Sequence, residues 1–272
     1  MAPDIGTPES VRLSRRLMRH VVAIYFDFNL HEEHLQFVQT AFVFAVDGRW
    51  MLMTAGHCVT DIADIRRSGA TLHRSKLVDF MGEGATYQHP IPFDYDGTSP
   101  MHIGVRENID YGVLVPHVNT CQLLSANNVE PFDERMWDTE PSSVQNYFLL
   151  GFPAELNQLK GNQVNINASM FRLTRYAERP EDFPCEDPAI YFYGRVIEQP
   201  LGSLKGCSGG PIVALSPPNA EGQSTYHLVA MQVTTMGLDI KGMLMPPLGG
   251  LVRGLLARRA DVESRGPHET QP

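Results

Sequence analysis

The chain has 272 residues, of which 43% are hydrophobic and 19% are charged, a composition typical of a globular protein rather than a disordered or fibrous one. Its formal net charge of −9 argues against nucleic acid as the main partner. No apolar run approaches the roughly 18 residues that read as a membrane span. Residues 1–9 have neither the basic start nor the apolar core of a secretory signal. We therefore expect neither a membrane span nor a signal peptide.

Short β-branched and aromatic runs separated by glycine and proline predict an all-β protein of short strands. The strands predicted in the first half are 21–26, 40–46, 49–53, 70–80 and 111–115. Asp47-Gly48 is a signal for a two-residue type I′ hairpin, since both turn positions require positive φ. Residues 88–100 contain several prolines and are predicted to be a surface loop. The basic segment 12–19 is expected to be a solvated or weakly helical lead-in rather than a contact with an anionic surface.

The second half continues the same pattern after a predicted connector over 118–142. The strands predicted there are 144–150, 163–173, 190–197, 211–215 and 227–233. Residues 178–188 are predicted to be an acidic loop. Helical spacing and good helix-forming residues predict a C-terminal helix over 251–260, and the polar residues 261–272 are expected to be disordered.

One serine is flanked by glycines in Gly206-Cys207-Ser208-Gly209-Gly210-Pro211. A serine hydroxyl is a weak nucleophile at neutral pH and needs a base and an orienting acid. Thr54-Ala55-Gly56-His57-Cys58 offers His57 as the base. Asp110 opens an apolar strand, where a buried carboxylate requires a partner. The order histidine, aspartate, serine is one of those in which a catalytic triad occurs.

Four other polar residues are weaker candidates for a functional site. Asp94 and Asp96 are rival acids, but they lie among prolines and glycine and are better explained as loop residues. His31 and His34 have i,i+3 spacing, which is not the zinc-binding H-E-x-x-H pattern. A solvated turn explains them better, and no metal is expected.

The serine, histidine and aspartate motifs, together with Leu149-Leu150-Gly151-Phe152-Pro153, resemble those of the chymotrypsin/trypsin-like serine proteases over roughly residues 38–240. The chain is most similar to the disulfide-free bacterial type. This resemblance implies an all-β fold of two six-stranded antiparallel β-barrels with a C-terminal α-helix. The implied domains are a lead-in (1–20), an N-terminal barrel (21–125), a C-terminal barrel (126–250), and a helix with a disordered tail (251–272).

The resemblance also implies a role for each motif residue. Ser208 would be the nucleophile, His57 the general base and then acid, and Asp110 the residue that orients the imidazole. The backbone N–H groups of Gly206 and Ser208 would form the oxyanion hole. No organic cofactor is implied, and the expected partner is a protein or peptide substrate.

The same resemblance places the base of a specificity pocket at Gly202. The other residues implied at the substrate are Ser203, Lys205, Val233, Thr234 and Thr235, the last three on a strand that pairs with the substrate backbone. Gly202 carries no acid that would favour arginine or lysine. We therefore expect a small apolar residue or an uncharged polar residue before the scissile bond. Asp239 could reach the pocket but is better explained as a turn residue.

The four cysteines are Cys58, Cys121, Cys185 and Cys207. Secreted members of the family pair the cysteine after the catalytic histidine with one that falls here near Phe42, and Leu204 occupies another of their cysteine positions. The absence of these pairs predicts a reducing compartment, the cytoplasm of a bacterium. Cys207 replaces an aspartate that captures the new N-terminus after zymogen cleavage, so no such activation is expected. An alternative makes Cys207 the nucleophile, as in viral cysteine relatives.

The sequence therefore predicts a cytoplasmic serine endopeptidase, of a kind that can serve as a bacterial effector switched on by an activating protein partner. Two alternatives stay open. One is a protease-fold binding or scaffold module without turnover, and the other is an esterase that uses the same three residues.

Overall fold

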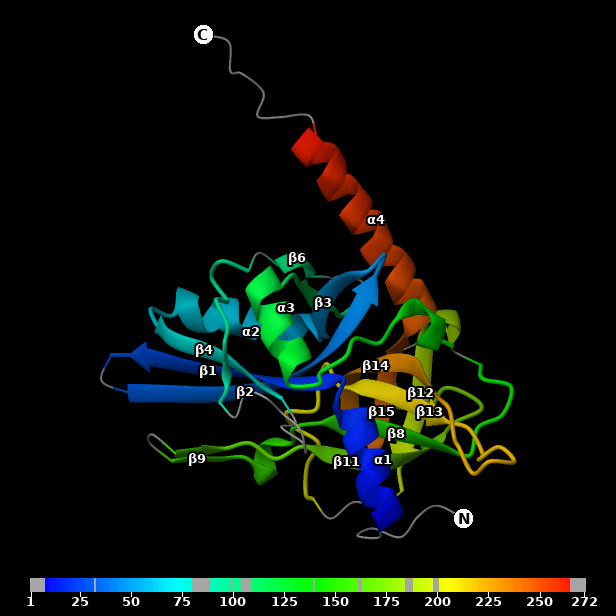
Figure 1. Ribbon diagram of the computed structural model, residues 1–272. Helices are drawn as coiled ribbons and strands as arrows, with labels where there is room; N and C mark the ends of the chain where they lie inside the picture. The colour runs from blue at the N-terminus through cyan, green and yellow to red at the C-terminus, as the bar shows by residue number, and fades with distance from the viewer. Residues whose placement is uncertain are drawn as a thin grey trace.

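The computed structural model describes residues 8–31, 33–79, 89–98, 100–103, 109–138, 140–160, 163–183, 188–197 and 201–264. Two β units lie side by side, and a long C-terminal helix projects from them (Figure 1). The elements in chain order are α1 (Pro8–Met18), β1 (Val21–Leu30), β2 (Glu33–Val46), β3 (Arg49–Thr54), α2 (Gly56–Arg67), β4 (Thr71–Asp79), β5 (Ile91–Pro92), β6 (Pro100–Ile103), β7 (Gly112–Leu114), α3 (Val118–Ala126), η1 (Glu134–Met136), β8 (Asn146–Gly151), η2 (Ala154–Leu156), β9 (Gln158–Lys160), β10 (Gln163–Asn165), β11 (Ser169–Arg175), η3 (Pro188–Ile190), β12 (Tyr191–Val196), β13 (Pro211–Leu215), β14 (Tyr226–Met236), β15 (Asp239–Leu244) and α4 (Met245–Ser264).

The N-terminal unit is a seven-stranded sheet in the order β5-β4-β1-β2-β3-β7-β6, in which every pairing is antiparallel. Asp47 (φ 50°) and Gly48 (φ 74°) form the turn between β2 and β3, as the predicted type I′ hairpin requires. One face of this seven-stranded sheet buries an apolar cluster that includes Phe26, Phe28 and Leu52. Alternation along the strands sends these side chains to one side of the sheet.

The C-terminal unit is a closed antiparallel barrel of six strands, in the order β11-β12-β15-β14-β13-β8. A separate apolar cluster fills it, including Leu149, Phe192 and Ile212. The all-β class and the C-terminal helix are confirmed, and the arrangement is consistent with the trypsin-like double-barrel fold that the sequence predicts.

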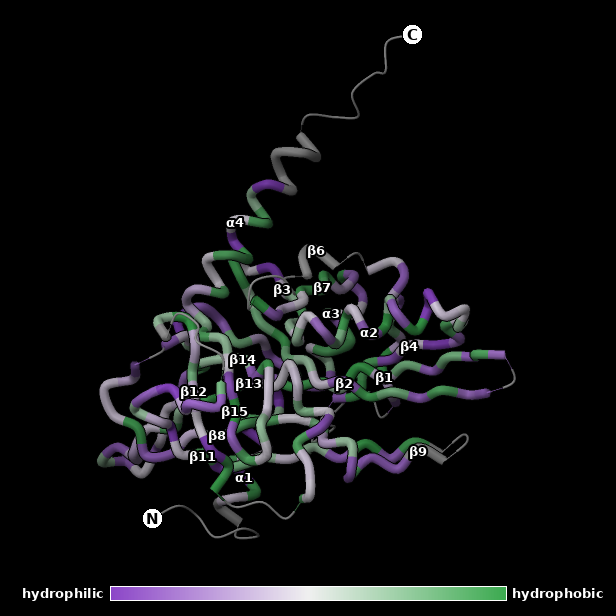
Figure 2. The backbone as a smooth tube through the Cα atoms, turned by 180° about the vertical axis from the view of Figure 1, so that it is seen from behind, coloured by the Kyte–Doolittle hydropathy of each residue, from purple (hydrophilic) through white to green (hydrophobic). Residues whose placement is uncertain are grey.

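A third apolar cluster joins the two units. It combines residues of the N-terminal sheet such as Phe42 and Met51 with residues of the barrel such as Leu150 and Met231, and it also takes in α1 and α4. The hydrophobic stretches in Figure 2 follow the strands of both units. Because burial of apolar surface is the main favourable term in folding, this cluster fixes the two units against each other.

Several elements differ from the sequence-based expectations. The predicted connector contains α3, whose N-cap is His117. The single strand predicted over 163–173 is two strands, since β10 pairs with β9 and β11 enters the barrel. The sequence does not predict β15, because its glycine and lysine break the apolar pattern. Gly242 lies opposite Gln232 of β14, and a side chain at this position would collide with Ile212.

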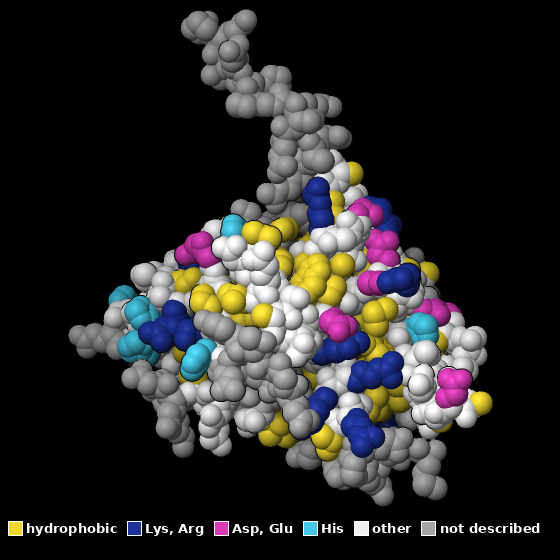
Figure 3. Space-filling model, in the orientation of Figure 1, with side chains coloured by type: hydrophobic (Ala, Val, Ile, Leu, Met, Phe, Trp, Pro, Cys, Tyr) yellow, Lys and Arg dark blue, Asp and Glu magenta, His cyan; other side chains and the backbone are white. Residues whose placement is uncertain are grey.

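Helix α4 begins before residue 251 and continues into the tail that was expected to be disordered, as far as Ser264. Cys185 and residues 265–272 lie outside the described residues. No helix in the part of the chain that the structure describes is long and apolar enough to cross a membrane. Acidic and basic side chains are intermixed over the face shown in Figure 3.

Candidate active site

His57 lies in the first turn of α2, directly after β3 delivers the chain to the seam between the two units. Gly56 makes this placement possible. A Cβ on Gly56 would lie 2.9 Å from Asp110 Oδ1 and 2.9 Å from the Tyr111 nitrogen. Real Cβ atoms do not come so close to backbone, so a side chain here would push α2 away from the segment that carries Asp110.

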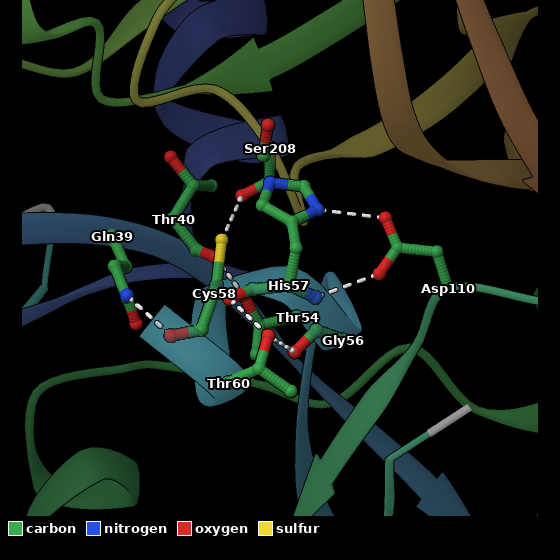
Figure 4. Close-up of polar contacts among 9 residues, drawn as sticks. All are labelled: Gln39, Thr40, Thr54, Gly56, His57, Cys58, Thr60, Asp110 and Ser208. Atoms are coloured by element: carbon green, nitrogen blue, oxygen red, sulfur yellow. Dashed lines mark hydrogen bonds and ion pairs between the residues drawn. The ribbon is translucent and has the colours of Figure 1, made fainter. Parts of the chain in front are cut away.

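Asp110 binds His57 through both carboxylate oxygens. The backbone N–H of His57 donates to Oδ1 and the ring Nδ1 donates to Oδ2, each over 2.7 Å (Figure 4). A carboxylate can only accept, so Nδ1 carries the proton. In the neutral imidazole, Nε2 is then the free acceptor. The structure thus brings together two residues that the sequence predicts as a pair.

The surroundings of His57 favour its charged form. The hydrogen bond to Asp110 is the largest cause, and contact with Cys58 adds to it; burial acts in the opposite direction but is weaker. Together they raise the pKa of His57 above its usual value. The side chain of His57 remains 37% exposed and that of Asp110 22%, so the pair can be reached from outside.

Ser208 lies in the loop that leads into β13, next to α2. Its carbonyl oxygen is 3.9 Å from Cys58 Sγ, which donates to it. In Figure 4 the imidazole lies between Asp110 and Ser208, and dashed lines connect the ring to Asp110 only. Within the described residues, Ser208 Oγ makes no hydrogen bond to His57.

The loop before Ser208 presents two backbone amides without acceptors. Ala154 N donates to the Lys205 carbonyl over 2.7 Å. Carbonyl and amide point in opposite directions across a trans peptide, so the Gly206 N–H faces away from Ala154. Neither the Gly206 N–H nor the Ser208 N–H has an acceptor in the described ranges. Gly206 has φ of +93°, a conformation that glycine adopts without steric cost.

Cys207 is fully buried inside the barrel unit, where its neighbours include Gly151. Burial raises the pKa of its thiol to about 12. A thiol needs its thiolate form to attack a carbonyl. The location of Cys207 therefore argues against the alternative in which this residue is the nucleophile.

Three of the residues predicted at the substrate, Gly202, Ser203 and Lys205, lie in the loop that leads to Ser208. Gly202 is exposed, and its N–H donates to Glu155 Oε2 over 2.9 Å. Lys205 is exposed as well, and its N–H donates to Ser203 Oγ over 3.0 Å. Glu155 was not predicted; it lies on η2, distant in sequence, and no motif marks it.

Strand β14 has an open edge near the serine loop. Its pairing with β13 ends at Pro211 and Met231, and Gln232 then bonds the backbone of the loop at Gly209 and Gly210. Beyond this point Val233 is buried, Thr234 exposed and Thr235 half-buried. Thr234 and Thr235 pair with β15 on one side, and no strand among the described residues pairs with the other side.

The rival residues are occupied elsewhere. Asp94 Oδ1 accepts from the Gly97 N–H in its own loop, and Asp96 pairs with Arg66. Asp239 binds the Tyr176 hydroxyl over 2.6 Å and Arg195 over 3.1 Å.

His34 Nδ1 lies 3.5 Å from Asp27 Oδ1. No group of three or more histidine, cysteine, aspartate or glutamate side chains that could hold a metal occurs in the described ranges.

Two residues of β2 that the sequence did not indicate also contact the site. Gln39 Nε2 donates to the Cys58 carbonyl over 2.6 Å, and Thr40 Oγ1 donates to the Gly206 carbonyl over 2.6 Å. A strand residue of this kind carries no local signal, because its partner is distant in sequence.

No family model matches the chain, and no curated protein matches it. Among solved structures, the chain is similar to a thermostable serine protease AL20 from an extremophilic microorganism, with 16% identity, a TM-score of 0.46, and coverage of 84% of this chain and 91% of that one. It is also similar to the protease Anisep from Arthrobacter nicotinovorans, with 17% identity, a TM-score of 0.45, and coverage of 84% and 90%.

Proposed function

We propose that the chain is a serine endopeptidase in which Ser208, His57 and Asp110 act as a triad. The observation that carries this proposal is the pairing of His57 with Asp110, which leaves Nε2 of the neutral imidazole as the free acceptor beside the Ser208 loop. A Ser208 hydroxyl turned toward Nε2 would complete the set. Catalytic hydrogen bonds are often long or absent in the free enzyme and tighten when substrate binds.

In the proposed reaction, Ser208 Oγ attacks the peptide carbonyl while His57 Nε2 takes its proton. The imidazolium then gives that proton to the leaving amine as the peptide C–N bond breaks. Water, deprotonated by His57, releases the acyl group and restores the serine. Asp110 keeps the imidazole in the required tautomer and stabilises its charged form throughout.

The amides of Gly206 and Ser208 would bind the oxygen that becomes negative in the tetrahedral intermediate. Both lack acceptors within the described residues, so they are available to a substrate oxygen. Donors held in place before reaction are often the largest single contribution to such catalysis.

The open edge of β14 favours a peptide over a small ester as the substrate. An extended peptide can add to this edge as a strand, through Val233–Thr235, which supplies affinity from main-chain hydrogen bonds. Gly202 itself carries no acid, and the Glu155 carboxylate beside it already accepts from the Gly202 N–H over 2.9 Å. We therefore propose a small apolar or an uncharged polar residue before the scissile bond. A bacterial cytoplasmic location, an effector role and an activating protein partner stay predictions from the resemblance.

The proposal is tested by incubating the protein with a peptide library and identifying products by mass spectrometry. Cleavage that requires Ser208 supports it, and the cleavage sites report the preferred residue. Hydrolysis of simple esters with no peptide cleavage would favour the esterase. A well-folded protein that neither cleaves peptides nor reacts with a fluorophosphonate would favour the scaffold module.

Replacing Gly206 with alanine is expected to lower kcat by about 10²–10³-fold, the loss that follows when one oxyanion donor is removed. The new Cβ would lie 2.7 Å from the Phe152 carbonyl oxygen and 2.9 Å from the Ala154 nitrogen, and alanine strongly disfavours φ of +93°. The loop must then shift its amide. Steady-state kinetics on a cleaved peptide measure the effect. Gly222→Ala is the control, because Gly222 also has positive φ but open space around it; equal losses in both variants would contradict the prediction.

As pH rises, kcat/KM is expected to increase when His57 loses its proton. The midpoint of this increase should lie above the usual histidine pKa of about 6.5, because Asp110 raises the pKa of His57. Removing the Asp110 charge should move this midpoint to lower pH. The same linkage stabilises the fold: the contribution is complete below about pH 6.5 and is lost as pH rises through the raised pKa. A midpoint that does not move in Asp110→Asn would contradict the assignment.

A further inference from the structure

Thr40 connects the two β units at the base of the serine loop. Its side chain and backbone are fully buried. Its Oγ1 donates to the Gly206 carbonyl over 2.6 Å and accepts from the Phe152 N–H over 2.9 Å. Its own carbonyl accepts from Thr54 Oγ1 over 2.8 Å. One hydroxyl of the N-terminal sheet thus satisfies two backbone groups of the barrel unit.

The Thr40 contact fixes one of three consecutive peptide planes in the serine loop. A peptide plane is rigid, so holding its carbonyl also fixes its N–H. The plane between Lys205 and Gly206 is held by Ala154 N on the Lys205 carbonyl. The next plane is held by Thr40 on the Gly206 carbonyl.

The third plane joins Cys207 to Ser208. Its carbonyl accepts from the Gly210 N–H over 2.8 Å, which leaves the Ser208 N–H pointing the other way. The first and third planes therefore carry the two free amides, and the Thr40-bound plane lies between them. Within the described residues, Thr40 is the only residue from the N-terminal unit that binds a carbonyl of these three planes.

The side chain of Cys207 does not anchor the serine loop. Cys207 is buried, and its burial raises the thiol pKa to about 12, so it forms no ion pair that could anchor the loop. The Cys207 backbone N–H bonds only locally, to the Leu204 carbonyl over 3.0 Å. The long-range anchor of the central plane is the Thr40 hydroxyl.

We infer that Thr40 is a positioning residue, whose hydroxyl holds the serine loop with the Gly206 and Ser208 amides directed at the reacting carbonyl. This inference rests on the proposed protease function. It also accounts for a loop that is formed without a processed N-terminus, because both partners of the Thr40 hydroxyl are internal backbone groups.

The test replaces Thr40 with valine, which keeps the shape and removes the hydroxyl. We expect kcat on a cleaved peptide to fall by about 10²-fold, the size of losing one oxyanion donor, with little change in KM. Thr40→Ser keeps the hydroxyl and should restore most of the rate. Thr98→Val is the matched control, because Thr98 is similarly buried (5% exposed) and its Oγ1 donates to the Asp94 carbonyl over 2.6 Å.

A crystal structure of Thr40→Val supplies a readout that does not need activity. We expect the Gly206 carbonyl to leave its present position and the Cys207 N–H of the same plane to turn with it. The two flanking planes, which carry the Gly206 and Ser208 amides, should then shift as well. An unchanged loop together with an unchanged kcat would overturn the inference, while fluorophosphonate labelling of Ser208 would leave the protease proposal standing. If the wild-type protein neither labels nor cleaves, the protease proposal fails, and the loop structure still decides the role of Thr40. Thr40→Ala replaces the valine variant if thermal unfolding shows that valine is not tolerated.

Discussion

Replacing Ser208 with alanine is expected to lower peptide hydrolysis by about 10⁶-fold, the loss found when the nucleophile of such a triad is removed. The reason is chemical: without Oγ no acyl-enzyme can form, and only binding and the free amides of the loop remain to assist attack by water. Reaction with a fluorophosphonate should disappear in the same variant. Both effects are measured with purified protein, by peptide kinetics and by intact-mass spectrometry.

Ser216→Ala is the control for this variant. Ser216 follows the far end of β13, where its Oγ accepts from the Thr225 N–H over 2.8 Å, and its removal should change neither rate nor labelling. A Ser208→Ala protein that still cleaves peptides at the wild-type rate would contradict the assignment. Labelling at another residue would do so as well.

Replacing Asp110 with asparagine should lower kcat by about 10⁴-fold while leaving the fold intact. An asparagine side chain has one acceptor oxygen and one donor nitrogen, so it cannot accept both bonds that His57 now donates. The imidazole would favour the opposite tautomer, with its proton on Nε2, and could not take the serine proton. Steady-state kinetics give the loss, and thermal unfolding shows whether the fold is retained.

Asp96→Asn is the matched control, because Asp96 is a carboxylate of the same half that pairs with Arg66 on the surface. Exposed pairs of this kind contribute about 0–1 kcal/mol, and the rate should be unchanged. Near-normal turnover in Asp110→Asn would reassign the acid. A loss of similar size in Asp96→Asn would show that the rate responds to any change of charge in this unit.

The sequence predicted the parts of the site that depend on local residue types. His57 and Asp110 were proposed as partners from their motifs, and the structure places their side chains 2.7 Å apart. The Asp47-Gly48 turn was predictable because few residues tolerate positive φ. The barrel strands other than β15 were largely predictable for a different reason, since short β-branched and aromatic runs between glycine and proline favour strands.

Features that depend on distant contacts were not predictable. Thr40 looks like any strand threonine, and only the fold brings it to Gly206. Glu155 was missed for the same reason, although its carboxylate binds the Gly202 amide. The sequence does not predict helix α3, because Val118–Ala126 is short and has weak amphipathic character. Packing against the sheet outweighs local preference here.

The most direct test of the central claim is a crystal structure of the protein after reaction with a peptidyl phosphonate. We predict a covalent bond from Ser208 Oγ to phosphorus, the phosphoryl oxygen within hydrogen-bond distance of the Gly206 and Ser208 amides, and His57 still bound to Asp110. An unreacted Ser208 in a crystal soaked to completion, or an adduct on another residue, would contradict the account.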